Sequence, residues 1–204
     1  MRRFGLDEAA ELFVPQASSP AEYRLMQALL LELWQDRAVT IVHCAACEFG
    51  FADPFLAGTP EFYQLQAPDT PYPNDKWEFR RTLRALRGQQ DSGCDLLDIG
   101  AGKGYFLAHL IAQGWDKTRL SATEFSEVGR LAVERLGVRC FPADLRDLTY
   151  DDAFDVICMF EVLEHLDGYD ALFAAIDRIC RVSADLFIAV PNGARITFNE
   201  QNGL

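Results

Sequence analysis

The chain has 204 residues, half of them hydrophobic and a quarter charged, and its formal net charge is −12. This composition is typical of a globular domain with a sizeable core, and the length allows one such domain plus an extension. An acidic chain repels phosphate backbones, so we expect no nucleic-acid partner. No apolar run approaches membrane-spanning length and the start lacks a signal-peptide core, so we expect no membrane association. Four of the six cysteines stand in or next to apolar stretches, which favours buried free thiols and a cytoplasmic location.

The first expected element is a helix from Ala21 to about Asp36. Ser19 and Pro20 are typical of a helix start, and an apolar stripe follows at helical spacing. A short strand is expected from Val39 to His43. Residues 1–20 carry no other strong signal.

Cys44 and Cys47 form a C-x-x-C pair, which is half of the ligand set of a zinc ribbon. Residues 1–43 contain no cysteine, and His43 is the only other soft ligand nearby in the sequence. We therefore expect a turn without metal. A zinc half-site and a redox pair are the alternatives, although the βα context that a redox pair requires is missing.

Prolines and aromatic residues alternate closely over residues 54–76. Proline at this density argues against a regular helix or central strand, and the aromatic residues argue against a solvated linker. We expect an ordered arm, which is either a lid over an acceptor pocket or a packed surface loop. A basic helix is expected next, from Lys76 to Arg87, and its apolar members are Trp77, Phe79, Leu83 and Leu86.

The most informative stretch spans residues 95–107. Its apolar run from Leu96 to Ile99 predicts a strand buried on both faces, and glycines follow at positions 100, 102 and 104. A helix is expected from about Lys103 to Gln113, so the order is that of a nucleotide-binding βαβ unit. Tyr105 replaces the third glycine of a dinucleotide fingerprint, and the Ser or Thr of a phosphate-binding P-loop is missing after Lys103.

Four further strands are expected downstream, each followed by residues that favour a turn or a helix. They span Leu120–Glu124, Val138–Phe141, Phe154–Phe160 and Leu186–Val190. Acidic residues stand at or just after the first three strand ends, and a helix with one apolar side precedes the last strand.

Two of these stretches, in this order, resemble a known family. Asp98-x-Gly-x-Gly-x-Gly and Phe154-Asp-Val…Glu-Val-Leu-Glu-His-Leu166 are similar to motifs of the class I S-adenosylmethionine (SAM)-dependent methyltransferases, and the resemblance covers roughly residues 76–193. The usual Pro-Gly-Gly turn before the fifth strand is absent, and Val182-Ser-Ala stands there. Residues 44–54 resemble the small Cys-containing element of many bacterial members, with its first Cys pair missing.

The resemblance implies an α/β fold with a doubly wound, mostly parallel Rossmann-like sheet of order 3-2-1-4-5 and helices on both faces. It also implies an N-terminal extension and arm over residues 1–75 and a SAM-binding domain over residues 76–204. Class I sheets normally carry two further strands after the fifth. We therefore expect this domain to be incomplete at its C-terminus, with the fifth strand as an open edge.

The resemblance also implies SAM as cofactor and methyl transfer to an O, N or C nucleophile of a small-molecule or glycan-type acceptor. The glycine loop and Asp98 would take the methionine moiety, Glu124 the ribose, and Asp144 with Leu145 the adenine. Phe160 and Glu161 would line the far side. The full set of expected cofactor contacts is Asp98, Gly100, Ala101, Gly102, Gly104, Tyr105, Glu124, Phe125, Ser126, Asp144, Leu145, Phe160 and Glu161.

His165 is the candidate general base, because imidazole takes up a proton near neutral pH; a structural role at a helix start is the alternative. A further alternative is that Glu161, Glu164 and His165 bind a divalent ion. Similar residues occur in the ubiquinone-pathway O-methyltransferases that this strand resembles. Without additional ligands we expect no metal. Two other functions stay open: a non-catalytic SAM-binding or scaffold protein with a decayed acceptor site, and a nucleotide-sugar or NAD enzyme.

Overall fold

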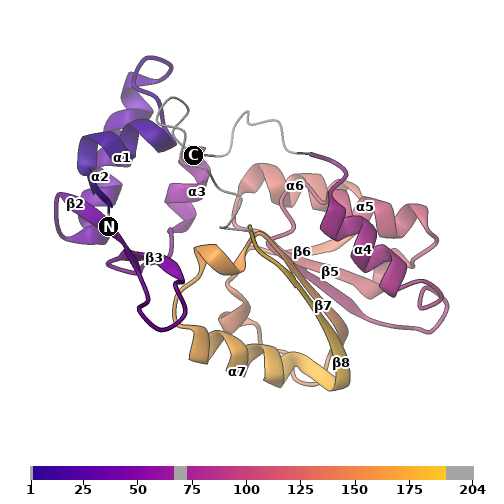
Figure 1. Ribbon diagram of the computed structural model, residues 1–204. Coiled ribbons are helices and arrows are strands. Elements are labelled where there is room, and N and C mark those ends of the chain that lie inside the picture. Colours follow the sequence, from indigo (N-terminus) through magenta and orange to yellow (C-terminus); the bar gives the residue numbers. More distant parts are fainter. Residues whose placement is uncertain (1, 67–72, 192–204) are drawn as a thin grey trace. The chain divides into compact units, whose positions relative to one another are not determined.

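The computed structural model describes residues 2–66 and 73–191, which fall into two compact units (Figure 1). The first unit lies within residues 2–66 and the second within residues 73–191, and each has its own sheet and core. The expected domain boundary at residues 75 and 76 stays a prediction. No helix in these two ranges is long and apolar enough to cross a membrane.

The first unit combines a three-stranded antiparallel sheet, of order β1-β2-β3, with helices. Its elements are β1 (Arg2–Gly5), α1 (Leu6–Phe13), α2 (Pro20–Trp34), β2 (Ala38–His43), β3 (Gly50–Asp53) and α3 (Pro60–Gln66). The helix expected from Ala21 is confirmed as α2, and the strand expected from Val39 as β2. Ser19 occupies the N-cap position of α2, but its side chain makes no capping hydrogen bond.

The prediction that the prolines of residues 54–76 exclude a helix is wrong for α3. Pro60 is the first residue of this helix, where a backbone N–H would have no intrahelical partner, and no proline follows within it. The N–H of Phe62 donates to Thr59 Oγ1 at 3.3 Å and stabilises the helix start. The rest of the expected arm includes residues 67–72, which lie outside the described residues.

Cys44 and Cys47 lie in the turn between β2 and β3. The turn is closed by two backbone hydrogen bonds of 2.8 Å, from Cys44 N–H to the Phe49 carbonyl and from Glu48 N–H to the Cys44 carbonyl. Hydrogen bonds from the backbones of Ala46 and Cys47 lower the pKa of the Cys44 thiol. In the part of the chain that the structure describes, no three His, Cys, Asp or Glu side chains gather as a metal site. The metal-free turn stays a prediction.

The second unit is a five-stranded parallel sheet with helices on both faces (Figure 1). Its strand order, β6-β5-β4-β7-β8, confirms the predicted order 3-2-1-4-5. Its helices are α4 (Trp77–Ala85), α5 (Tyr105–Ala112), α6 (Glu127–Arg135) and α7 (Tyr169–Ile179), with short 3₁₀ helices at Lys117–Arg119, Leu145–Asp147 and Leu163–His165. Its strands are β4 (Leu96–Ile99), β5 (Leu120–Thr123), β6 (Arg139–Phe141), β7 (Phe154–Phe160) and β8 (Cys180–Ala189).

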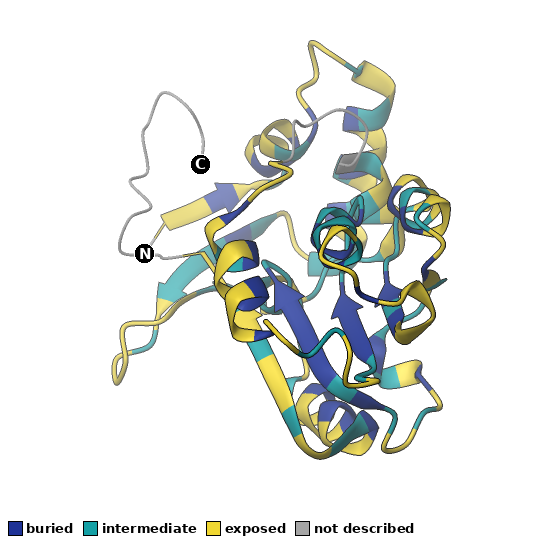
Figure 2. Ribbon diagram, turned by 90° about the vertical axis from the view of Figure 1, so that its right-hand side faces the viewer, coloured by how far each residue is buried: buried dark blue, intermediate teal, exposed yellow. Residues whose placement is uncertain are grey.

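The core of this unit lies on both faces of the central strands, which are almost entirely buried (Figure 2). Successive side chains of β4 point to opposite faces, so Leu96 packs with α4, α5 and α6 while Leu97 packs with α7. Each such buried side chain contributes roughly 1.5–3 kcal/mol relative to exposure. The continuous apolar runs of β4 and β7 are therefore explained by helices on both sides.

Helix α4 differs from its prediction at one residue. Phe79, Leu83 and Leu86 are buried as expected, but Trp77 is 66% exposed. Trp77 is the first residue of α4, and Arg81, one turn further on, lies over its ring at 5.8 Å from Arg81 Cζ to the ring centroid. The indole therefore belongs to the solvent face of the helix.

Strand β8 begins at Cys180, six residues before the predicted start at Leu186. Its pairing with β7 is irregular, because Cys180 pairs with Phe154 and Asp185 with Val156, so residues 181–184 bulge opposite Asp155. Ser183 in this bulge has φ +70°. The stretch that stands in place of the usual Pro-Gly-Gly turn is therefore a bulge inside the strand.

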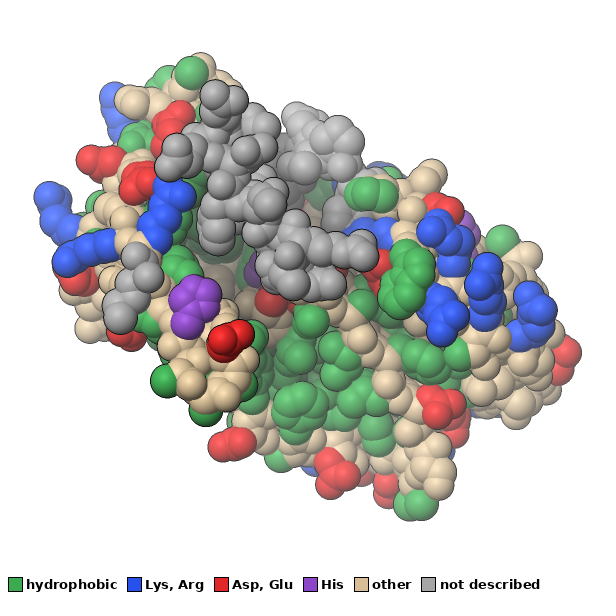
Figure 3. All heavy atoms as spheres, in the orientation of Figure 1, with side chains coloured by type: hydrophobic (Ala, Val, Ile, Leu, Met, Phe, Trp, Pro, Cys, Tyr) green, Lys and Arg blue, Asp and Glu red, His purple; other side chains and the backbone are tan. Residues whose placement is uncertain are grey.

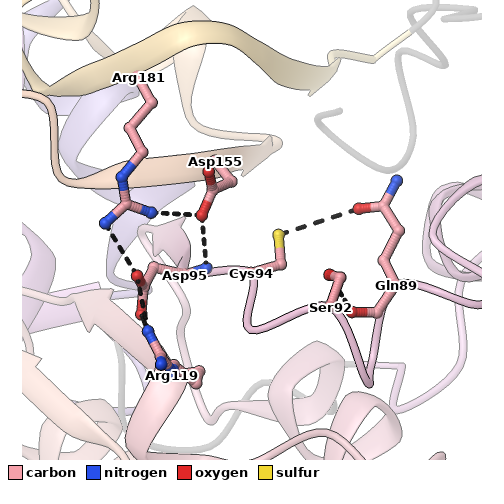
Figure 4. Close-up of polar contacts among 7 residues, drawn as sticks. All are labelled: Gln89, Ser92, Cys94, Asp95, Arg119, Asp155 and Arg181. Atoms are coloured by element: carbon pink, nitrogen blue, oxygen red, sulfur yellow. Dashed lines mark hydrogen bonds and ion pairs between the residues drawn. The ribbon is translucent and has the colours of Figure 1, made fainter.

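An ionic cluster holds this bulge at the amino ends of the strands (Figure 4). Arg181 pairs with Asp155 and lies 3.0 Å from Asp95, and Arg119 lies 3.1 Å from the same Asp95 carboxylate. The backbone N–H of Asp95 donates to Asp155 at 2.8 Å. The cluster joins the residues just before β4 and β5 to the second residues of β7 and β8, at the edge of the sheet opposite to the carboxyl ends.

Strand β8 is an edge of the described sheet, and its Leu186 and Ile188 are 40% and 38% exposed. Residues 192–204, which follow this strand in the sequence, lie outside the described residues. The expected incompleteness of the domain therefore stays a prediction.

Candidate cofactor site

The expected site residues follow the carboxyl ends of parallel strands, which meet at one edge of the sheet. Gly100 follows β4, Glu124 follows β5, Asp144 comes after β6 and Glu161 follows β7. The winding of the sheet reverses between β4 and β7, so Gly100 and Glu161 flank the topological switch point. Ligands of doubly wound sheets bind at this place.

The glycine loop after β4 has the left-handed backbone that its sequence predicts, with φ of +66°, +54° and +74° at Gly100, Gly102 and Gly104. Two hydrogen bonds tie it to the end of β5, from Ala101 N–H to the Thr123 carbonyl at 3.0 Å and from Gly100 N–H to Thr123 Oγ1 at 3.3 Å. A Cβ on Gly100 would lie 2.5 Å from Val162 Cγ2, so a side chain is excluded there.

Glu124 holds the glycine loop and the start of α6 together. Its Oε2 accepts the N–H of Gly102 at 2.8 Å, and its Oε1 accepts the N–H of Ser126 at 2.7 Å. Each carboxylate oxygen has a further lone pair, so this side chain retains acceptor capacity for ligand hydroxyls. Ser126 caps α6 by accepting the N–H of Gly129 at 3.1 Å.

Gly129 belongs to the site and was missed from the sequence. A Cβ on this residue would lie 2.7 Å from the Glu124 Cγ, the Gly102 carbonyl oxygen and the Ser126 hydroxyl. The close approach of α6 to the glycine loop therefore requires glycine at this position. A glycine in the first turn of the expected helix was the available signal, but it does not reveal which backbone it approaches.

Replacing Gly129 with alanine is expected to destabilise the fold by roughly 1–3 kcal/mol, because the added methyl group overlaps backbone and polar atoms that cannot all move away. Thermal unfolding measures the change. Gly5→Ala is the control, since the space around Gly5 is open and its φ is −72°. An unfolding temperature equal to that of Gly5→Ala would contradict the close packing of α6 on the loop.

Asp98 lies in β4 just before the loop and is only 2% exposed. Burial, with a smaller effect of the nearby Glu124 carboxylate, raises the pKa of Asp98 to about 8. Most Asp98 side chains are therefore protonated at neutral pH. A cationic ligand group beside this carboxyl would favour its ionised form.

Glu161 is held in a left-handed conformation, with φ +55°, directly after β7. Its N–H donates to the Ala189 carbonyl of β8 at 2.8 Å, and its carboxylate pairs with the ammonium of Lys76. Lys76 is 9% exposed and also lies 3.7 Å from Glu78. Sequence reasoning missed Lys76, which joins the start of α4 to the switch point; a non-glycine residue at positive φ is often found at functional sites.

Glu164 and His165 lie in the short 3₁₀ helix that follows. Burial raises the pKa of Glu164, and among residues 2–66 and 73–191 its Oε2 atom is buried and has no hydrogen-bond partner. His165 is exposed. Both groups therefore follow closely after the carboxyl end of β7.

The remaining expected contacts also have structural roles. Asp144 accepts the Nε and Nη2 of Arg146 at 2.8 and 2.7 Å, and Arg146 in turn reaches Asp167, so the turn after β6 is an ionic cluster. Phe160 is buried against Phe106 and Phe79, with ring centroids 4.9 and 5.3 Å apart. The other positions are Tyr105 at the first residue of α5, Phe125 next to Glu124, and Leu145, which is 3% exposed, in the core under α7.

A family model described as a methyltransferase domain matches residues 74–201 of the chain. The chain belongs to this methyltransferase family. The SAM-dependent methyltransferase that the two motifs predicted is thereby confirmed at the level of the family, as is SAM as its cofactor. The match begins three residues before α4 and includes every residue of the candidate cofactor site.

The methyltransferase domain is similar to two kinds of curated protein. One is a tRNA U34 carboxymethyltransferase of Shewanella woodyi, 29% identical over 103 residues that make up 48% of this chain and 30% of the relative. The other is a ubiquinone biosynthesis O-methyltransferase of Paramagnetospirillum magneticum, 34% identical over 104 residues, or 45% of this chain and 41% of the relative. The chain thus spans less than half the length of either relative.

Among solved structures, the chain is similar to a TehB-like SAM-dependent methyltransferase from Corynebacterium glutamicum. The TM-score is 0.49 and the identity 22%, with 62% of this chain and 68% of the other covered. The assignment of the fold rests on the strand order and helix layers of this chain itself.

The residues of the site fit SAM. The space beside Gly102 in the glycine loop is open, Glu124 offers acceptor capacity, and Asp98 offers a buried carboxyl that a ligand ammonium would ionise. These are the donor and acceptor types that a methionine moiety and a ribose require.

Proposed function

We propose that this methyltransferase domain transfers the methyl group of SAM to a small-molecule or glycan-type acceptor. The observation that carries the proposal is the contact between Glu124 and the glycine loop at the switch point, within the stretch that the methyltransferase family model matches. SAM, when bound, supplies an electrophilic methyl group on a sulfonium. The chain holds the nucleophile, the methyl group and the sulfur in line in a water-poor pocket, and this positioning accounts for most of the acceleration in reactions of this kind.

Each expected contact has a proposed role. The glycine loop and Asp98 hold the methionine moiety, and Glu124 holds the ribose. Asp144 and the backbone of Leu145 meet the adenine, while Phe160 and Glu161 support the far side. The Lys76–Glu161 ion pair fixes the strand end from which Glu164 and His165 follow.

His165 is the proposed proton acceptor for the nucleophile of the acceptor molecule. It is exposed, near the end of β7, and imidazole takes up a proton close to neutral pH. Glu164, with its unbonded buried oxygen among the described residues, is a second group at the same place. His165→Gln should lower the rate of methyl transfer and leave SAM affinity unchanged.

The test is transfer of isotope-labelled methyl groups from SAM to a panel of phenols, amines, sugars and tRNA, with mass spectrometry of the co-purified ligands as the first step. Labelling of a small molecule or a glycan supports the proposal. Labelling of tRNA alone would overturn the acceptor class, and SAM binding without transfer to any acceptor would favour a non-catalytic SAM-binding protein.

A further inference from the structure

The solvent face of α4 concentrates positive charge on an otherwise acidic chain. Residues 76–87 contain five basic residues and a single acidic one, whereas the whole chain has 19 basic and 31 acidic residues. Figure 3 shows blue side chains gathered over α4. We call this surface the arginine face; its residues are Trp77, Arg80, Arg81, Arg84 and Arg87, all exposed.

The face follows from the helical period. Phe79, Leu83 and Leu86 bury one side of α4 against the sheet, which turns the residues between them to solvent. Arg81 lies over the Trp77 ring, and Arg80 pairs with the exposed Asp75 at 2.8 Å. Within residues 2–66 and 73–191, no acidic side chain pairs with Arg84 or Arg87.

We propose that the arginine face is a docking surface for an extended, carboxylate-rich segment of a partner protein. Arginine forks bind carboxylates with two hydrogen bonds, and arginine and tryptophan are the residue types that dominate binding energy at protein interfaces. This inference goes beyond the proposed methyl transfer and does not depend on it.

The spacing of the face fits an extended segment. Arg80 and Arg84 are one turn apart, or about 6 Å along the helix axis. Alternate side chains of an extended strand lie on the same side about 6.6 Å apart. Acidic residues at every second position would therefore meet successive arginines, and an aromatic side chain would pack on the exposed edge of Trp77.

The charge and burial of the chain disfavour the two other polyanions. RNA binds through many phosphate contacts, and the four arginines of a single helix face provide few of them. A helix that inserts into a membrane surface needs a free apolar face, but the apolar face of α4 is buried in the core. A short acidic segment meets neither obstacle.

The experiment measures binding of a labelled decaglutamate peptide to the full chain by fluorescence anisotropy at low and physiological salt. Arg81→Glu/Arg84→Glu should weaken binding at least tenfold and make it less sensitive to salt, since two charge contacts are reversed. Arg24→Glu/Arg135→Glu is the matched control, because both arginines are exposed and the net-charge change is the same. The control should stay within about threefold of the wild type.

Three checks keep the result decisive. SAM titration and circular dichroism report whether each variant is folded, and the single variants Arg84→Ala and Trp77→Phe serve if the double variant is not. Each single variant should weaken binding measurably. Equal weakening by both double variants, or tighter binding of decauridylate RNA or phosphatidylserine vesicles than of decaglutamate, would overturn the proposal.

Discussion

Replacing Glu124 with alanine is expected to weaken SAM binding at least 100-fold. The carboxylate accepts hydrogen bonds from Gly102 and Ser126, and in the proposed function it also accepts the ribose hydroxyls. Hydrogen bonds to a charged group contribute roughly 1.5–3 kcal/mol each, and 1.4 kcal/mol is a tenfold change in affinity. Isothermal titration with S-adenosylhomocysteine, the demethylated product, measures the loss.

Two variants separate the roles of this side chain. Glu124→Gln keeps the shape but has one acceptor oxygen, so it cannot accept from both Gly102 and Ser126 and should lose an intermediate amount. Glu127→Ala removes an exposed carboxylate from the same segment and should bind normally. The role toward the ribose is tested with a ligand that lacks the 2′-hydroxyl. The wild type should bind this 2′-deoxy ligand more weakly than the normal ligand, and the difference in affinity should be smaller in Glu124→Ala. An equal difference in affinity in the wild type and in Glu124→Ala would contradict a contact between Glu124 and the ribose and leave only its hydrogen bonds to the loop.

The second large effect is expected at Asp98, whose pKa is raised from 3.8 to about 8 in the folded chain. The folded state therefore keeps a proton that the unfolded state has released between these two pH values. The contribution of this group to stability is complete below about pH 4 and is lost as pH rises through about 8. The wild-type chain should thus become less stable over this window on account of Asp98.

Asp98→Asn removes the titrating group without changing the shape, so its stability should not fall through this window. A shift of about 4 pKa units corresponds to about 6 kcal/mol, so at pH 9 the variant should be more stable than the wild type by up to this amount, with a Tm higher by about 10–20 °C. Chemical denaturation without SAM, from pH 5 to 9, measures the difference. The exposed Asp91→Asn is the control. Parallel pH profiles of the wild type and Asp98→Asn would contradict the account of Asp98.

Much of the parallel sheet was predictable because β4 and β7 are largely apolar runs and the turn after β4 is marked by glycines. The start of β8 was not, since pairing from Cys180 onward depends on a bulge that Arg181 anchors to Asp155 and Asp95. That contact is tertiary and leaves no periodic signal. Helix α3 was missed for a local reason, because proline was read as a helix breaker rather than as a first residue.

The site divides in the same way. The glycine loop and Glu124 lie close together because β4 pairs in parallel with β5, and the sequence predicted both strands. The Lys76–Glu161 pair joins residues 85 positions apart, and the contact of Gly129 with Gly102 depends on how closely α6 approaches. The sequence also predicted the basic helix that carries the arginine face, but which of its residues face solvent depends on how α4 packs on the sheet.

The most direct test of the central claim is isothermal titration of the full chain with S-adenosylhomocysteine and, separately, with NAD. The account predicts one adenosyl ligand per chain at the glycine loop, with affinity lost in Gly102→Val, and no binding of NAD. Absence of S-adenosylhomocysteine binding by the folded chain, equal affinity in Gly102→Val, or preference for NAD would contradict it.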